Sequence, residues 1–459
     1  MNRQFDLIVL GSGSGARDGA NKARQEFGAD VALVESTRWG GSCPNVACKP
    51  TKAYLVAAEY AHDINTFVPK LGIEVGPASV NLARVKARKD SLIVSRKTWL
   101  ERIRSAGHTA FDGVGGFEDA QTIAVDGDRI SAERILVATG SRTAAPPIEG
   151  LDEVGWIDHV TALELTELPE SLLVLGGGPV GLEFAQMFAR FGSRVVVVQL
   201  PDRISPRSDA TAADELAAAL EDEGIELRTG VTLSHVRREG GDVVASLGDD
   251  EIRVAQILLA AGRLPNVEGL QLEQVGIERT RDGIAVDDEL RTSVDGVWAA
   301  GDVTGTHQFT PVAQYEARVA VENMFAGNGA RAEYDALPTV IFTDPELAAV
   351  GLTEEEAQSR GLDYEATVHP IKYVQRASYT DRKRGLYKVI WDRGSRRLLG
   401  IHLVTRGAGD IVQGFGLAMK LGATVDDLAR MHHAFPTLAE GLKAAAEQGS
   451  SPVAAASPA

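Results

Sequence analysis

The chain has 459 residues, of which 44% are hydrophobic, 24% are charged and 48 are glycine. This length exceeds one ordinary core, so several domains are expected, and the composition argues against a fibrous or disordered chain. The net charge of −17 disfavours nucleic acid and anionic membranes as partners. The apolar stretch 7–10 is too short for a signal-peptide core, and no apolar run approaches the roughly 20 residues that span a bilayer, so a cytoplasmic location is expected.

The N-terminal residues predict a unit of two strands joined by a helix. A strand is expected over residues 5–10, a glycine-rich turn over 11–16, a helix over 20–27 and a second strand over 31–35. This order within about thirty residues is typical of a dinucleotide-binding fold.

Four residues of this unit are candidate cofactor contacts. Gly11 permits the sharp turn, Gly13 lets the backbone approach a pyrophosphate, and Ala16 keeps the helix close to its strand. The helix N-terminus then faces the phosphates with its partial positive charge. Glu35 ends the second strand, where it can accept hydrogen bonds from ribose hydroxyls.

The only two cysteines of the chain, Cys43 and Cys48, stand in the next segment, residues 39–52. In a reducing compartment such a pair is more often catalytic or metal-binding than structural. A zinc site needs two further ligands nearby, which this segment lacks, so no metal is expected. At a helix start the two thiols can close a disulfide, and the helix dipole favours a thiolate.

A second nucleotide-binding unit is predicted from residue 172. A strand over 172–175, a turn over 176–181, a helix through Arg190 and a strand over 194–199 repeat the first pattern. The candidate contacts of the turn are Gly176, Gly178, Val180 and Gly181.

The position that would hold an acidic residue in this second unit is Gln199. A carboxylate there would repel a 2′-phosphate by roughly 1 to 4 kcal/mol. Gln199 removes that repulsion without adding a cation, while Arg203 and Arg207 lie within reach in the following loop. The sequence therefore favours NADPH over NADH.

From about residue 337 the pattern changes to a separate α+β domain. Its expected strands and helices are 339–342, 386–391, 398–404, 410–421 and 425–431. The tail from Gln448 is rich in Ala, Ser and Pro and is expected to be disordered.

The segment 39–52 closely resembles the redox motif of the class I pyridine nucleotide-disulfide oxidoreductases, which include lipoamide dehydrogenase, glutathione reductase and mercuric reductase. Residues 138–140, 261–266 and 300–302 resemble the later signatures of that family, in the expected order. The resemblance implies two dinucleotide-binding, Rossmann-like domains and a C-terminal α+β dimerisation domain. The implied parts are an FAD-binding domain at 1–146 and 267–336, an NAD(P)-binding domain at 147–266, a dimerisation domain at 337–447 and a disordered tail at 448–459.

The resemblance also implies roles for particular residues. Hydride from NAD(P)H would reach FAD, Cys48 would be the flavin-proximal, charge-transfer thiolate, and Cys43 would be the interchange thiol that meets a small-molecule acceptor. Lys52 would lie near the reactive nitrogen of the flavin and pair with Glu183, and a homodimer would share its active sites. The other cofactor contacts implied are Gly41, Ser42, Gly115, Thr139, Gly140, Gly262, Arg263, Asp302 (at the ribityl chain) and Thr310.

One position departs from the family pattern. Disulfide-reducing members carry a His-Pro…Glu motif whose histidine is the acid/base for the interchange thiol, whereas this chain has Phe435 before the proline and keeps Glu440. The loss of a general acid/base typically costs about 10²–10⁴ in rate. His433 either substitutes for the missing histidine or is a structural residue at the dimer interface.

Two relatives also lack that histidine. Residues 440–445 resemble the C-terminal helix of mercuric reductase, which the chain resembles most, but that enzyme has a C-terminal cysteine pair and this chain has no third cysteine. The 2-ketopropyl-coenzyme M carboxylating reductase has Phe at this position, and its redox motif opens like residues 40–44.

Four functions thus stay open: a disulfide or thiophilic-metal reductase, an NAD(P)H:quinone diaphorase, ketone-cleaving carboxylase chemistry and a catalytically idle scaffold. The cysteine pair and Lys52 argue against the fourth, since a scaffold needs neither, and the first is the preferred hypothesis.

Overall fold

The structure is a computed structural model that describes residues 2–450, and the chain divides into two compact units. Unit 1 contains residues up to 53 together with 86–145 and 262–333, and unit 2 contains 54–85, 146–261 and the residues from 334. None of the helices within the described residues is long and apolar enough to cross a membrane. The tail predicted from Gln448 begins within helix α15 (Glu440–Gly449), and residues 451–459 lie outside the described part of the chain.

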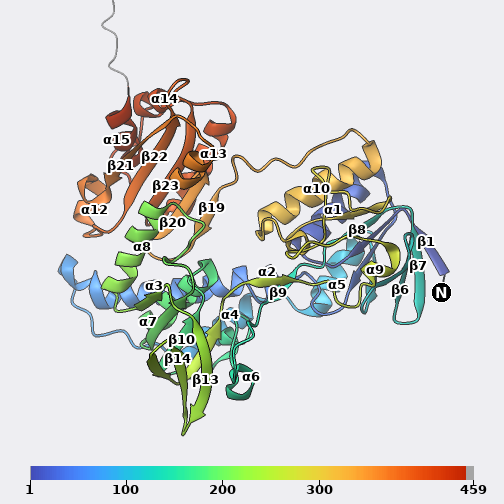
Figure 1. Ribbon diagram of the computed structural model, residues 1–459, viewed down its shortest axis with the longest axis horizontal. Helices are drawn as coiled ribbons and strands as arrows, with labels where there is room; N and C mark the ends of the chain where they lie inside the picture. Colours follow the sequence, from blue (N-terminus) through green and yellow to red (C-terminus); the bar gives the residue numbers. More distant parts are fainter. Residues whose placement is uncertain (1, 451–459) are drawn as a thin grey trace, which may run out of the picture. The chain divides into compact units, whose positions relative to one another are not determined.

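Unit 1 is built on a five-stranded parallel sheet with the strand order β18-β8-β2-β3-β4. These strands are β18 (Val297–Ala299), β8 (Ile135–Val137), β2 (Leu7–Leu10), β3 (Val31–Glu35) and β4 (Thr109–Asp112). Every residue of β2 is buried, as expected for a parallel strand covered on both faces. Helices α1 (Ser14–Phe27) and α10 (Thr310–Ala326) lie side by side (Figure 1), with Gly19 facing Ala317.

The other elements of unit 1 are short. A four-stranded sheet has the order β1-β7-β6-β5, and two further strands, β17 and β9, form a pair. These elements are β1 (Asn2–Phe5), β7 (Asp128–Ala132), β6 (Thr122–Val125), β5 (Gly116–Asp119), β17 (Arg263–Pro265), β9 (Ser141–Thr143), α2 (Ser42–Asn45), α5 (Arg96–Ser105) and α9 (Leu272–Val275). Helices α3 (Cys48–Thr66) and α4 (Leu82–Leu92) each run from one unit into the other.

Two predicted boundaries in unit 1 were wrong. The single strand expected over 5–10 is two strands, because β1 pairs with β7 while β2 pairs with β3 and β8. The helix expected from residue 20 already begins at Ser14. Glycines in its first turns favour a turn by propensity, but a side chain at Gly15 would press on the carbonyl of Ala313 in α10 at 2.5 Å, so close helix packing selects glycine there.

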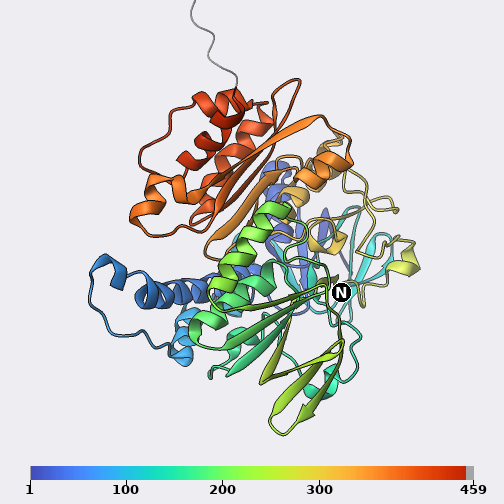
Figure 2. The same cartoon turned by 60° about the vertical axis from the view of Figure 1, so that its left-hand side comes forward.

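The C-terminal part of unit 2 is a five-stranded antiparallel sheet with the order β19-β20-β23-β22-β21 (Figure 2). Its strands are β19 (Thr339–Ile341), β20 (Glu346–Gly351), β23 (Leu398–Thr405), β22 (Leu386–Asp392) and β21 (Tyr364–Pro370). Helices α13 (Ala408–Lys420) and α15 bury apolar side chains against one face, in a cluster that includes Val389, Ile401 and Leu442. The short helices of this part are α11 (Glu354–Ser359), α12 (Gln375–Tyr379) and α14 (Val425–Arg430).

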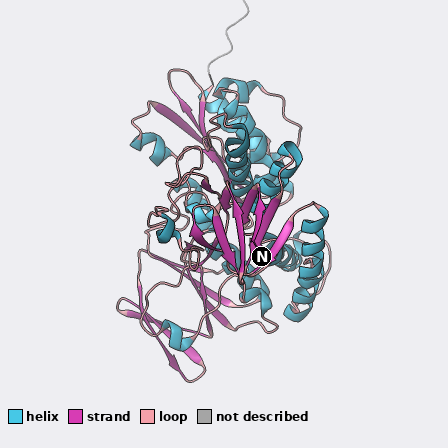
Figure 3. Ribbon diagram, turned by 90° about the vertical axis from the view of Figure 1, so that its right-hand side faces the viewer, coloured by secondary structure: helices cyan, strands magenta, loops and turns pink. Residues whose placement is uncertain are grey.

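The other part of unit 2 contains the second nucleotide-type sheet, which is parallel and has the order β12-β11-β10-β16. Between β12 and β16 the chain forms a three-stranded antiparallel sheet of β13, β14 and β15 (Figure 3), which was absent from the sequence prediction. The elements are β10 (Ser171–Leu175), β11 (Arg194–Gln199), β12 (Glu226–Thr229), β16 (Gln256–Leu259), β13 (Leu233–Glu239), β14 (Asp242–Leu247), β15 (Asp250–Val254), α6 (Leu151–Val154), α7 (Pro179–Phe191) and α8 (Ala210–Asp222).

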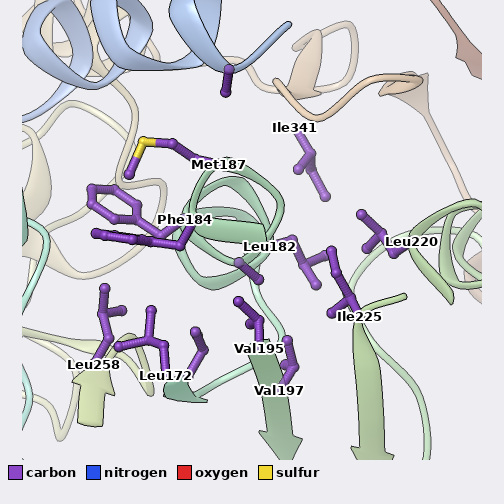
Figure 4. Close-up of a cluster of buried hydrophobic side chains, with 14 of the residues drawn as sticks. Leu172, Leu182, Phe184, Met187, Val195, Val197, Leu220, Ile225, Leu258 and Ile341 are labelled. Carbon is purple, nitrogen blue, oxygen red and sulfur yellow. The ribbon is translucent and has the colours of Figure 1, made fainter. Parts of the chain in front are cut away.

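Helix α7 is fixed by an apolar cluster between it and this parallel sheet. Leu182 on the helix and Val195 and Val197 on β11 are at most 1% exposed (Figure 4). Full burial of one such side chain stabilises the fold by about 1.5–3 kcal/mol. The cluster also reaches Ile341 of β19, so it joins the nucleotide-type sheet to the C-terminal sheet within unit 2.

A buried ion pair crosses the same part of unit 2. Asp209, which caps the N-terminus of α8, accepts hydrogen bonds from Lys388 Nζ at 2.9 and 2.8 Å. The Lys388 side chain is 2% exposed and that of Asp209 is 0% exposed, and Glu354 also pairs with Lys388 at 2.6 Å. Removal of one partner would leave a buried charge, which costs about 3–5 kcal/mol. The pair therefore anchors the start of α8, and with it the loop that follows β11.

Candidate functional site

The turn between β2 and α1 in unit 1 has the geometry of a phosphate-binding turn. Gly11 has a φ of 109°, and a side chain there would collide with the carbonyl of Ala138, so only glycine fits. Gly13 is the N-cap of α1, with no side-chain cap, no acidic residue in the first turn and no atom within 4 Å of where its Cβ would be. The first amide groups of α1 are thus available to an anion, as a dinucleotide pyrophosphate requires. Ala16, in the first turn of α1, is buried.

Glu35 is held beside this turn at the end of β3. Its Oε2 accepts hydrogen bonds from the backbone N–H and the hydroxyl of Ser12, at 3.0 and 2.7 Å. Its Oε1 accepts hydrogen bonds from the backbone and hydroxyl of Thr37, at 2.8 and 3.0 Å. The carboxylate is therefore fixed in the position predicted for a ribose contact.

Two other predicted cofactor contacts, Asp302 and Arg263, come together around Ser141. Ser141 Oγ donates to Asp302 Oδ2 at 2.6 Å, and Arg263 Nε donates to Ser141 Oγ at 2.8 Å. Arg263 also pairs with Asp302 at 3.3 Å. Sequence reasoning missed Ser141, although its place directly after the 138–140 signature was a usable signal.

Three more predicted contacts lie in unit 1 as well. Thr139 Oγ1 donates to the carbonyl of Asn266 at 2.7 Å, and the Gly140 carbonyl accepts from Asn266 N–H at 2.9 Å, so the 138–140 signature contacts the end of the 261–266 signature. Gly115 is buried, and a Cβ there would come within 2.9 Å of Leu10. The described residues of unit 1 therefore fit an FAD site, and when bound, FAD supplies the capacity to accept hydride and pass electrons to a sulfur.

The two cysteines lie at the junction of two helices, α2 and α3. Cys43 is in α2, Cys48 is the first residue of α3, and both are free thiols. Cys48 Sγ lies 3.6 Å from Oγ1 of Thr310, the first residue of α10. A side chain at Gly41 would collide with Gly13, so the redox loop is held close against the phosphate-type turn.

The two thiols titrate as a coupled pair. The pKa of Cys43 is lowered to about 6, first because Cys48 donates a hydrogen bond to it, and further by Thr310, Arg17 and Lys52. The pKa of Cys48 is raised, first by that same hydrogen bond to Cys43. One proton is thus shared between the sulfurs, with the negative charge on Cys43 in the chain by itself. Charge on Cys48, as the family resemblance implies for the FAD-bound enzyme, stays a prediction.

Two residues that sequence reasoning missed hold the redox loop in place. The Asn45 amide donates to the carbonyls of Trp39 and Gly41, at 3.0 and 2.7 Å. Its Oδ1 accepts a hydrogen bond from Trp99 Nε1 at 3.2 Å. Asn45 stands between the two cysteines in the sequence, which was a usable signal, whereas nothing local to Trp99 indicates that it reaches this loop.

In unit 2 the second glycine-rich turn repeats the first. Gly176 has a φ of 114°, and Gly178 is the uncapped N-cap of α7. Val180 and Gly181 lie in the first turn of α7, where Gly181 packs against the Gly176 carbonyl. Gln199 Oε1 accepts a hydrogen bond from the backbone N–H of Gly177 at 2.7 Å, as Glu35 does from Ser12 in unit 1. These described residues therefore fit a dinucleotide.

The two arginines after β11 differ in their contacts. Arg203 pairs with Glu355 at 2.9 Å and donates to the carbonyl of Pro206 at 3.3 Å. Arg207 is exposed and forms no ion pair within the described part of the chain. Arg207 is thus the cation of this loop that is available to a 2′-phosphate, while Arg203 braces the loop.

Glu183 and Lys52 lie in different units. Glu183, on α7, is 6% exposed, and its Oε1 accepts a hydrogen bond from the backbone N–H of Phe342 at 3.1 Å. Lys52 lies one turn after Cys48 in α3, in unit 1. Their pairing stays a prediction.

The C-terminal segment places Phe435 and His433 in different surroundings. Phe435 is 73% exposed, and Glu440 accepts a hydrogen bond from the backbone N–H of Thr437 at 2.9 Å. The pKa of His433 is lowered, first by burial and then by Lys443. The Nε2 atom of His433 is buried and has no hydrogen-bond partner within the described residues. Both roles considered for His433 therefore stay predictions.

Comparisons with known proteins cover most of the chain. A family model described as "Pyridine nucleotide-disulphide oxidoreductase" matches residues 5–317, and that of its dimerisation domain matches residues 337–446. A mercuric reductase of Streptomyces lividans is 38% identical over 98% of this chain and 97% of its own length. A dihydrolipoyl dehydrogenase of Thermus scotoductus is 36% identical over 97% of each chain. The Cu(II) complex of the HOCl-induced flavoprotein disulfide reductase RclA from Escherichia coli superposes with a TM-score of 0.88 at 28% identity, over 98% of this chain and 100% of that one.

Proposed function

Since this chain belongs to the pyridine nucleotide-disulphide oxidoreductase family, we propose that it is an NADPH-linked reductase that delivers electrons through Cys43 and Cys48 to a thiophilic acceptor. The family and the two-domain match establish a flavoprotein oxidoreductase with a dimerisation domain, which confirms the fold predicted from the sequence. The observation that carries the proposal is the free thiol pair, with Cys48 against Thr310 in the unit that holds the FAD-type turn.

Each part of the chain has a task in this proposal. The N-terminus of α1 binds the FAD pyrophosphate and Glu35 orients the ribose, while Gln199 and Arg207 bind NADPH in unit 2. Cys48 is the sulfur next to the flavin. Cys43 attacks the acceptor as a thiolate, and the pair ends as a disulfide after giving up two electrons and the one proton that the two sulfurs share.

The class of acceptor follows from Phe435. Reduction of a disulfide releases a thiol that needs a proton, and a phenyl ring supplies none. A thiophilic metal ion takes the two electrons without that proton, and relatives of this chain include mercuric reductases. The best-supported acceptor is therefore a thiophilic metal ion or a disulfide that brings its own proton source. A quinone is a second candidate, because it too bypasses protonation of a departing thiol.

Reduction of the purified protein tests the proposed electron path. The protein should carry noncovalent FAD, and anaerobic addition of NADPH should produce long-wavelength absorbance from a thiolate beside the flavin. A Cys48→Ser variant should lose that band and still bind FAD. Bleaching of the wild-type flavin with no such band would show that the thiols are not coupled to it, and the proposal would then be wrong.

Exchange of Gln199 for glutamate tests the choice of nicotinamide. Gln199→Glu keeps the oxygen that accepts the Gly177 N–H and adds a negative charge that repels a 2′-phosphate. The preference for NADPH over NADH should fall by about tenfold, which corresponds to about 1.4 kcal/mol. Values of kcat/KM for both cofactors measure the change. A wild type that already prefers NADH strongly would show that the loop, rather than position 199, decides.

A further inference from the structure

Arg17 is a cation of unit 1 that the proposed mechanism has not yet used. It lies in the first turn of α1, is half-buried, and its Nε donates to the carbonyl of Ser12 at 3.2 Å. Its Nη2 is 3.5 Å from the hydroxyl of Ser14. Within residues 2–450 it forms no ion pair with a carboxylate, and the neighbouring Asp18 lies 3.8 Å from Arg318 instead. The guanidinium charge is therefore available to another anion.

The ring of Trp99 connects Arg17 to the redox loop. The guanidinium carbon of Arg17 lies 4.5 Å from the ring centroid of Trp99, a cation–π distance. The same ring covers Gly40, where a Cβ would come within 2.5 Å of it, and donates to Asn45 at 3.2 Å. One buried ring thus fixes both the guanidinium and the backbone on either side of Cys43.

We propose that Arg17 is an electrostatic positioning residue that keeps Cys43 in its thiolate form. Arg17 would thereby perform one of the two tasks of the histidine that is missing at position 435. A family histidine both stabilises the thiolate and returns a proton to the departing group. Arg17 can do only the first, because its guanidinium stays protonated throughout the working pH range. The inference rests on the proposed function only in taking Cys43 as the thiol that attacks the acceptor.

The groups around Cys43 support this assignment. Cys48, Thr310, Arg17 and Lys52 all lower the pKa of Cys43, while burial raises it, and Arg17 contributes more than Lys52 does. Burial lowers the pKa of Arg17, and Cys43 is the largest of the groups that act against this by raising it. A cation held at a fixed distance by a ring favours the thiolate by charge alone. The hydrogen bond from Cys48 is lost once Cys48 gives up its own proton, and the charge of Arg17 then remains.

The pH dependence of alkylation tests Arg17 directly. The FAD-loaded enzyme, reduced anaerobically, is treated with iodoacetamide from pH 5 to 9, and the rate at Cys43 is followed by peptide mass spectrometry. The thiolate reacts, so the wild-type rate should rise with a midpoint near the lowered pKa of about 6. In Arg17→Gln the midpoint should move up by about one unit or more, and thiolate reactivity below that midpoint should fall about tenfold. Arg17→Lys should restore most of the shift.

Arg102→Gln is the matched control. Arg102 lies over the same Trp99 ring at 5.2 Å, yet it is not among the groups that act on Cys43. Its variant should leave the midpoint unchanged, and FAD absorbance should show that each variant is folded and loaded. An unchanged midpoint in loaded Arg17→Gln, or an equal shift in Arg102→Gln, overturns the inference. If Arg17→Gln loses FAD, two other variants decide. The inference requires that the alkylation midpoint of Arg17→Lys stays near that of the wild type. It also requires that the alkylation midpoint of Trp99→Leu is raised. The NADPH-induced band tests the proposed function separately and does not depend on Arg17.

Discussion

The Phe435→His variant is expected to reduce lipoamide about 10²–10⁴ times faster than the wild type, because a positioned acid/base contributes that factor. Phe435 is 73% exposed and stands directly before Pro436. Glu440 is retained four residues after that proline, where it can orient an imidazole at position 435. The substitution therefore rebuilds the complete family motif with one exchange. Steady-state rates of lipoamide reduction with saturating NADPH measure it.

A different set of rates is expected if His433 acts as the acid/base. If His433 already delivered the proton, wild-type turnover of lipoamide would be fast, Phe435→His would gain little and His433→Ala would abolish activity. If Phe435 has instead left the site without an acid/base, His433→Ala should leave the slow rate nearly unchanged. Fast wild-type reduction of lipoamide would by itself contradict the interpretation of Phe435.

The Cys43→Ser variant is expected to lose turnover of a disulfide or thiophilic metal by about 10³-fold or more, as removal of a nucleophile usually does. Quinone turnover should survive, since electrons can leave the flavin without the thiols. Cys48 stays a free thiol in this variant, so long-wavelength absorbance should already be present in the oxidised protein and should disappear as NADPH reduces the flavin. Parallel assays with a quinone, a disulfide and a thiophilic metal ion measure the separation. Equal loss on all three acceptors would place the thiols on the path to every acceptor and exclude the diaphorase alternative.

Elements with a strong local pattern could be predicted from the sequence. The strands Val31–Glu35 and Arg194–Gln199 have the bounds that were predicted, because each buried apolar run ends at a polar residue, Glu35 or Gln199. The redox loop and both glycine-rich turns were likewise identified from residues adjacent in the chain. Cys43, Cys48 and Thr310 are brought together in unit 1, a contact that the sequence analysis did not include.

Contacts made across long sequence distances could not be predicted. Trp99 reaches Asn45 over 54 positions, and Arg17 reaches that ring from a different helix. A tryptophan or an arginine with helical spacing gives no local sign of such a partner. The early start of α1 also depended on a distant element, since α10 selects the glycines of its first turns.

The hydrogen bond from Gly177 N–H to Gln199 limits how cofactor choice can change during evolution or design. Gly177 is buried, so its N–H needs an acceptor, and loss of that acceptor costs about 1–3 kcal/mol. An arginine at position 199, an obvious way to attract a 2′-phosphate, has no acceptor and would weaken the turn that binds the same molecule. Glutamine and glutamate both keep the acceptor and differ only in charge. In this fold a single exchange between glutamine and glutamate at position 199 can therefore change the preference between NADPH and NADH. Stronger affinity for the 2′-phosphate has to come from residues outside β11.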